Sequence, residues 1–199
     1  MTSPPALVLS GVLVVGAALS AVRLTARTDG GSYLGGRSSD TAHLLMNAGM
    51  AAMLVVPATV LPPSVPLVLY AAIAAAFAGL VVLGLARPGP SRILHRPAHV
   101  YHAIAASAMV WAVHLMAPGP PLRPGPGHEM AGMPAVSGMP APTHHAPVAY
   151  VLAGLFVLDA VGTLALLRRL PDRTAVVPHV IMDVGMVLML VPAWLPLPA

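Results

Sequence analysis

Methionine and histidine recur at helical spacing in two segments of this chain. One reads HLLMNAGMAAML from His43 and the other HVIMDVGMVLML from His179, and both fit His-x2-Met-[Asn/Asp]-x-Gly-Met-x2-Met-Leu. On a helix, positions i, i+3, i+7 and i+10 fall within a stripe of roughly 80°, about 15 Å long. Each segment therefore predicts a row of thioethers that begins with an imidazole. The two rows are His43, Met46, Met50, Met53 and His179, Met182, Met186, Met189.

The same two residue types recur elsewhere. A third segment has a weaker form of the pattern, because His102 and Met109 repeat the seven-residue spacing of His43 and Met50. This segment also contains His99, His114 and Met116. A proline- and glycine-rich stretch over 118–146 holds a further group, and its composition predicts a loop and not a helix. That group is His128, Met130, Met133, Met139, His144 and His145.

Thioether and imidazole ligands together select soft cations, above all Cu(I). Both are neutral, and a row of weak sites lets an ion step along it. The chain has 12 methionines, 9 histidines and no cysteine, so thiolate sites and disulfides are excluded. We therefore expect Cu(I) as the bound metal, with all of the methionines and histidines named above, together with Asp183, as candidate ligands.

Methionine stripes also serve simply to fill gaps in a core, and that alternative has to be weighed. The distribution along the chain argues against it. Eight methionines and five histidines fall in the apolar segments, and all of them lie in the second, fourth and sixth such segment. Accidental packing would not favour alternate segments.

The composition indicates how these residues are held. Hydrophobic residues make up 57% of the 199 residues and charged residues 8%, against roughly 25% charge in soluble domains. Apolar runs of about 20 residues are long enough to cross a bilayer as helices. We expect an all-α polytopic membrane protein, a single membrane domain whose six transmembrane helices form three tandem hairpins. The predicted spans lie near 6–26, 41–61, 66–86, 98–117, 147–167 and 175–194.

Arginine placement predicts the orientation, because cytoplasmic loops are enriched in positive charge. The ten basic residues are all arginine. With six predicted spans, the connections lie alternately on two sides of the membrane, and one side carries only Arg123. The remaining nine lie on the opposite side, at Arg23, Arg27, Arg37, Arg87, Arg92, Arg96, Arg168, Arg169 and Arg173. Both termini are therefore expected outside the cytoplasm of a bacterial plasma membrane, and the 118–146 loop with them. The richness in alanine, glycine, proline and arginine suggests an actinobacterial type of genome.

Two acidic residues, Asp159 and Asp183, fall inside predicted spans, where carboxylates are costly and indicate function. They are expected to neutralise a monovalent metal cation or to carry a proton; the alternative is a hydrogen bond to a neighbouring threonine, asparagine or arginine. Asp40, just before the second span, is expected to be a helix N-cap. His99 and His102 are spaced i, i+3 and can share one metal or lie solvated near the headgroups.

Several resemblances accompany this pattern. Met-x3-Met inside a helix, with Met/His clusters outside, resembles the design of the Ctr copper transporters. The 118–146 loop resembles the Met/His-rich segments of bacterial copper-resistance proteins. The repeated His-x2-Met-x3-Met-x2-Met unit in a six-span chain resembles the DUF5134 family of multi-span membrane proteins. That last resemblance implies a fold and a compartment and supplies no reaction.

The leading functional hypothesis is copper transport or delivery, as a permease-like path or as a store or chaperone. The partners would be membrane lipid, the copper ion and a cuproenzyme or periplasmic-side copper chaperone, with no nucleic acid. A second hypothesis is a redox protein with a b-type haem held by His43, His99 or His102, and His179. A third is a structural or interaction protein without metal. No nucleophile motif or HExxH is present, so no enzyme activity is expected.

Overall fold

The computed structural model describes residues 4–26, 36–57, 59–86, 90–116, 146–166 and 173–190, and over these the chain is helical with short turns. The helices are α1 (Pro4–Ala26), α2 (Arg37–Val55), α3 (Ser64–Ala86), α4 (Pro90–Met116), α5 (Ala146–Leu166), the 3-10 turn η1 (Arg173–Ala175) and α6 (Val176–Leu190). The expected all-α class with six helices is confirmed. Of the expected 118–146 loop, residues 118–145 lie outside the described residues, and Ala146 begins α5.

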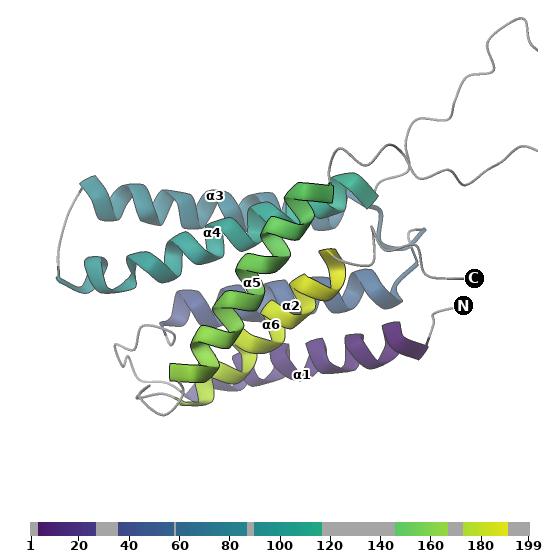
Figure 1. The fold of residues 1–199 in the computed structure, drawn as a ribbon, viewed down its shortest axis with the longest axis horizontal. Coiled ribbons are helices and arrows are strands. Elements are labelled where there is room, and N and C mark those ends of the chain that lie inside the picture. The colour runs from purple at the N-terminus through teal and green to yellow at the C-terminus, as the bar shows by residue number, and fades with distance from the viewer. Residues whose placement is uncertain are drawn as a thin grey trace, which may run out of the picture.

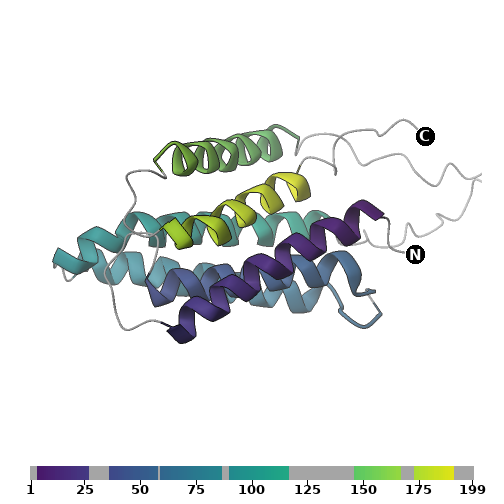
Figure 2. The same cartoon turned by 90° about the horizontal axis from the view of Figure 1, so that it is seen from below.

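Consecutive helices pair as three antiparallel hairpins, α1–α2, α3–α4 and α5–α6. Figure 1 shows the consequence: α2, α4 and α6 all run in one direction, and α1, α3 and α5 run in the other. The three even-numbered helices also contact one another, which makes them the inner helices of the bundle. Figure 2 shows α5 at the edge of the bundle, packed on α6.

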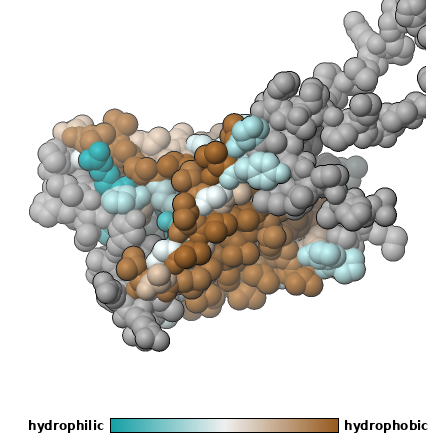
Figure 3. Space-filling model, in the orientation of Figure 1, coloured by the Kyte–Doolittle hydropathy of each residue, from teal (hydrophilic) through white to brown (hydrophobic). Residues whose placement is uncertain are grey.

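The odd-numbered helices are the apolar ones. Three helices are long and apolar enough to cross a membrane, namely Pro4–Ala26, Ser64–Ala86 and Pro147–Leu166, and less than a third of each is covered by the rest of the bundle. Their exposed side chains are valines and leucines such as Val14, Val68, Leu83 and Leu158. Figure 3 shows a broad apolar face, which is compatible with contact with membrane lipid.

Helix boundaries differ from the expected spans in ways that proline explains. α2 ends at Val55 and not at 61, because the residue before Pro57 is disfavoured in helical conformation. α4 begins at Pro90 and not at 98, because proline is well suited to the first helical position. Pro97 consequently lies inside α4 and not before it.

α6 is the shortest of the six helices, with 15 residues starting at Val176, one residue after the expected start. It reaches about 22 Å, less than the roughly 30 Å of a hydrocarbon core. It is also the most enclosed helix, because α1, α2, α4 and α5 all pack on it. Glycines allow the close approach to α1: a Cβ on Gly16 would lie 2.8 Å from Ile181 Cγ2, and a Cβ on Gly185 would lie 2.8 Å from Leu13 Cδ2.

Candidate functional site

Three buried histidines meet between the inner helices, one from each. His43 lies in the second turn of α2, His102 midway along α4, and His179 in the first turn of α6, and none is more than 3% exposed. The ring centroids of His43 and His102 are 4.9 Å apart, and those of His43 and His179 are 5.3 Å apart. We call His43, His102 and His179 the histidine cluster. The sequence repeat predicted that these residues share a depth, and the parallel course of the inner helices brings them together.

The cluster is extended by hydrogen bonds to an acidic residue of α5. His179 Nε2 lies 2.6 Å from Asp159 Oδ2, and His179 Nδ1 lies 3.1 Å from His43 Nε2. With both rings neutral, His179 donates from Nε2 to the carboxylate, so its Nδ1 must accept the proton of His43 Nε2. In this row of hydrogen bonds, His43 Nδ1 is then the nitrogen that keeps a free lone pair. Of the functions expected for Asp159, the structure shows a hydrogen bond, to a histidine and not to threonine, asparagine or arginine.

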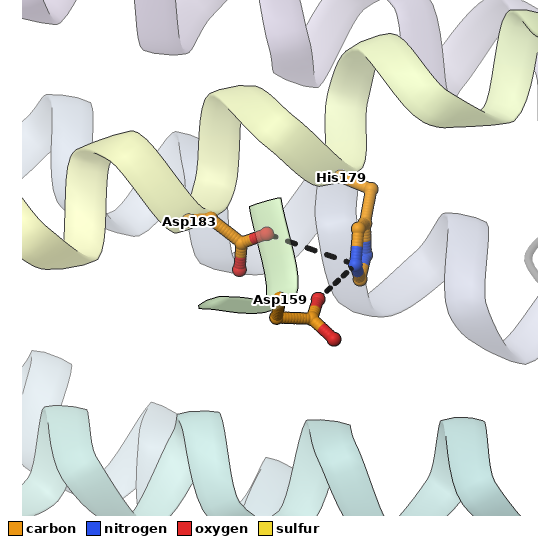
Figure 4. Close-up of side chains that lie close together, drawn as sticks. All are labelled: Asp159, His179 and Asp183. Atoms are coloured by element: carbon orange, nitrogen blue, oxygen red, sulfur yellow. Dashed lines mark hydrogen bonds and ion pairs between the residues drawn. The ribbon is translucent and has the colours of Figure 1, made fainter. Parts of the chain in front are cut away.

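Asp183 lies one turn after His179 on the same face of α6 (Figure 4). Its Oδ2 is 3.7 Å from His179 Nε2, and its Oδ1 accepts a hydrogen bond from the Tyr101 hydroxyl on α4. The Tyr101 ring also contacts His179, with 4.7 Å between centroids. Asp159, His179 and Asp183 offer three ligand atoms that all lie within 4.8 Å of one another.

Several polar atoms at this site are buried without a hydrogen-bond partner among the described residues. They are His43 Nδ1, His102 Nδ1, Asn47 Oδ1 and Asp183 Oδ2. Leaving such an atom unsatisfied costs roughly 1–3 kcal/mol, so a cluster of them favours a partner, either an ordered water or a bound ligand. A cavity of about 30 Å³ lies among the histidine cluster, Tyr101 and Asp159.

The methionine rows continue from the histidine cluster into the centre of the bundle. Met46, Met50, Met109, Met182 and Met186 are at most 1% exposed, Met189 is 8% exposed, and all six belong to one core cluster. Met53 packs against that cluster and is partly buried. The methionine rows therefore lie inside the bundle.

The remaining candidates do not join the site. His99 is half-buried against Phe77, with 5.8 Å between ring centroids, and His114 is exposed. The Met116 side chain lies outside the described residues, and so do the loop residues His128, Met130, Met133, Met139, His144 and His145. No prediction about those seven residues is tested by the structure.

A buried ion pair near the cluster was not expected from the sequence. Arg23 of α1 lies 2.9 Å from Asp40 Oδ1 of α2 and also donates to Thr174. The expectation that Asp40 caps α2 is therefore wrong, and Arg23, which was counted among the arginines of the cytoplasmic side, is buried within α1. α2 begins at Arg37 with Gly36 at the N-cap position, so Asp40 lies inside the first turn. The sequence did contain a signal, since Arg23 falls within an apolar run and a buried guanidinium requires an acid.

A groove of about 610 Å³ runs between α4 and α5. Arg96 and Pro97 line one part of it, Val100, Ile104 and Leu155 are among its apolar walls, and Tyr101 and Asp159 also line it. Because Tyr101 and Asp159 line the small cavity too, these two side chains form the partition between the open groove and the histidine cluster.

These features define a class: an all-helical bundle of three hairpins whose inner helices enclose a polar cluster inside an apolar protein. The family comparison places the chain within a particular family. A family model described as "Domain of unknown function (DUF5134)" matches residues 35–193, and the chain belongs to this family. The match begins just before α2 and covers every residue of the site. No curated protein and no solved structure matches the chain.

Proposed function

We propose that this chain is an integral protein of a bacterial plasma membrane that binds Cu(I) between its inner helices, for copper transport or delivery. One observation carries the proposal. His43 Nδ1 and His102 Nδ1 are buried without hydrogen-bond partners, and buried thioethers follow them on all three inner helices. Two imidazole nitrogens with neighbouring thioethers are a donor set suited to Cu(I).

Charge supports a monovalent ion in this part of the bundle. The described ligands of the proposed Cu(I) site, His43, His102 and the methionines, are neutral, so a bound Cu(I) would bring one positive charge to be balanced. Asp159 and Asp183 lie directly behind His179 and can balance that charge. His179 and Asp159 would also orient His43, in the way that carboxylate–histidine pairs orient metal ligands elsewhere.

The packing favours copper over a b-type haem. A haem macrocycle must lie between its two axial imidazoles. Here the rings of His43 and His102 are in edge contact, and the cavity beside them is about 30 Å³. A Cu(I) ion requires no such separation of the rings.

The test is to replace His102 by leucine and to measure Cu(I) affinity by competition with a Cu(I) chelator. Because Nδ1 of His102 has no partner, His102→Leu removes an unsatisfied buried atom and should leave the thermal stability of the metal-free protein unchanged or higher. Cu(I) affinity should fall at least tenfold, roughly the smallest loss expected from altering a metal site.

The matched control is His114→Leu, which changes an exposed histidine on the same helix. It should bind Cu(I) as the parent does. Equal Cu(I) affinity in His102→Leu and the parent would contradict the proposal.

A further inference from the structure

The two ring nitrogens of His179 face different sets of metal-ligating atoms. On the Nδ1 side lie His43 and the neutral ligands of the proposed Cu(I) site. On the Nε2 side lie two carboxylates, Asp159 Oδ2 at 2.6 Å and Asp183 Oδ2 at 3.7 Å (Figure 4). One imidazole with two carboxylates is a borderline-to-hard donor set, suited to Zn²⁺ or another divalent cation and poorly suited to Cu(I).

We propose that Asp159, His179 and Asp183 form a separate binding site for a divalent cation, with Zn²⁺ as the best-fitting ion. The site rests on geometry. Its three ligand atoms lie within 4.8 Å of one another, and two ligand atoms on one tetrahedral zinc ion lie about 3.4 Å apart. Movements of about 1 Å in the side chains bring the three atoms to that spacing.

An independent observation points to a cation. The Asp183 side chain is fully buried, and its Oδ2 accepts no hydrogen bond from an N–H or O–H donor of the described residues, with His179 Nε2 3.7 Å away. Buried carboxylates are normally paired or coordinate a metal. Tyr101 satisfies Oδ1 of Asp183 and fixes its rotamer, which leaves Oδ2 as the available ligand.

The charges match a divalent ion. Two carboxylates supply two negative charges, which Zn²⁺ neutralises in full while the proposed Cu(I) site is empty; the two cations therefore compete for the same negative charge. The proton on His179 Nε2 moves to Nδ1 of the same ring when the cation takes the Nε2 lone pair, so the ring stays neutral. Asp159 is 38% exposed and lines the α4–α5 groove, which gives the site an opening that the Cu(I) ligands do not share. Arg96 lies on that groove and is expected on the cytoplasmic side.

The experiment uses the purified full chain in detergent, dialysed with Zn²⁺, with metal content measured per chain; Co²⁺ is the spectroscopic probe. The parent should retain one Zn²⁺ that depends on these residues, and its Co²⁺ form should show visible d–d absorption. Asp183→Asn and Asp159→Asn should each weaken Zn²⁺ binding at least tenfold, since even altering an outer-shell partner costs about 10–100-fold. Asp159 is the more exposed position, so its variant remains informative if Asp183→Asn fails to fold.

Thr163→Val is the matched control, because Thr163 lies one turn after Asp159 on α5 and lines the same small cavity. It should keep the Zn²⁺ site. Zn²⁺ binding that survives both asparagine variants, or the absence of stoichiometric Zn²⁺ in the parent, overturns the proposal. Cu(I) measured on the same variants separates the two sites. Both proposals are supported where the asparagine variants lose Zn²⁺ and still bind Cu(I) with lowered affinity, since Asp159 and Asp183 also orient and balance the charge of the proposed Cu(I) site. Zn²⁺ binding in a protein that never binds Cu(I) contradicts the copper function alone.

Discussion

At the scale of single residues, the hydrogen-bond chain Asp159–His179–His43 decides which nitrogen is available to metal. Each neutral imidazole has one proton, so fixing the proton of His179 on Nε2 fixes that of His43 on Nε2 and frees His43 Nδ1. A change at Asp159 therefore alters which nitrogen of His43 carries the proton, and a change at His43 alters the proton position of His179 in the same way. His179 is the residue through which the proposed Cu(I) and divalent-cation sites are coupled.

That coupling predicts antagonism between the two metals. Zn²⁺ on His179 Nε2 moves the ring proton to Nδ1, which then donates to His43 Nε2 and leaves the proton of His43 on Nδ1. Cu(I) must displace that proton, so saturating Zn²⁺ should lower Cu(I) affinity by about 5–150-fold, the usual range of coupling between sites. Cu(I) titrations with and without Zn²⁺ measure the effect.

Linkage requires that Cu(I) lower Zn²⁺ affinity by the same factor. Asp183→Asn is the control, because a protein without the divalent site should bind Cu(I) equally well with and without Zn²⁺. Independent binding of the two metals to the parent would show that the tautomers of His43 and His179 are not linked as described.

Residue identities predicted part of this site and missed the rest for a physical reason. The repeat placed His43 and His179 at equivalent positions, so their meeting followed from spacing alone. Tyr101 and Arg23 belong to no repeat. Their partners, Asp183 and Asp40, lie 82 and 17 residues away. The Tyr101–Asp183 pairing depends on how two hairpins dock, and the Arg23–Asp40 pairing depends on how the two helices of one hairpin are rotated against each other. Helix periodicity determines which face a residue occupies and carries no information about the face that opposes it.

At the scale of helices, the division between outer and inner helices was visible in the sequence. All methionines of the predicted spans fall on α2, α4 and α6, and those whose side chains the structure describes are buried or partly buried. The helix ends were less predictable, because an apolar run does not reveal where a proline begins a helix or ends it. α4 therefore starts eight residues before the expected span.

The methionine rows provide a test at this scale. Met50, Met109 and Met186 occupy matching positions on the three inner helices and are all buried. Met→Leu conserves volume and costs typically under about 1.5 kcal/mol in a core, so the fold should survive. The triple variant should lose Cu(I) affinity or flux at least tenfold, roughly the lower limit for changes at a metal site, while thermal stability changes little.

Leu80→Met on α3 serves as the control for this triple variant, because Leu80 is exposed on an outer helix and an added thioether there should not alter Cu(I) binding. Unchanged Cu(I) binding in the triple variant would mean that the rows only fill the core. The copper proposal would then depend on the histidine cluster alone.

At the scale of the whole molecule, the hairpin arrangement gives the bundle a direction. The inner helices run in parallel (Figure 1), and on each of them the clustered histidine precedes the buried methionines along the chain, so the rows extend in the same direction from the histidine cluster. If the proposed metal binding holds, the side of the membrane on which the histidine cluster lies determines which compartment exchanges metal with it.

Arginine placement predicts that side. Arg23 is buried in an ion pair within α1 and is left out of the count, which leaves eight arginines against Arg123 alone. Eight against one still predicts the histidine cluster toward the cytoplasmic side and both termini outside. A reporter that functions only outside the cytoplasm should be active when fused after Ala199. A reporter that functions only in the cytoplasm should be active when fused after Gly89, between α3 and α4. The opposite pair of reporter activities would show that the bundle has the inverted orientation. The proposed metal sites would then exchange metal with the extracytoplasmic side, and the proposed divalent site would open outward.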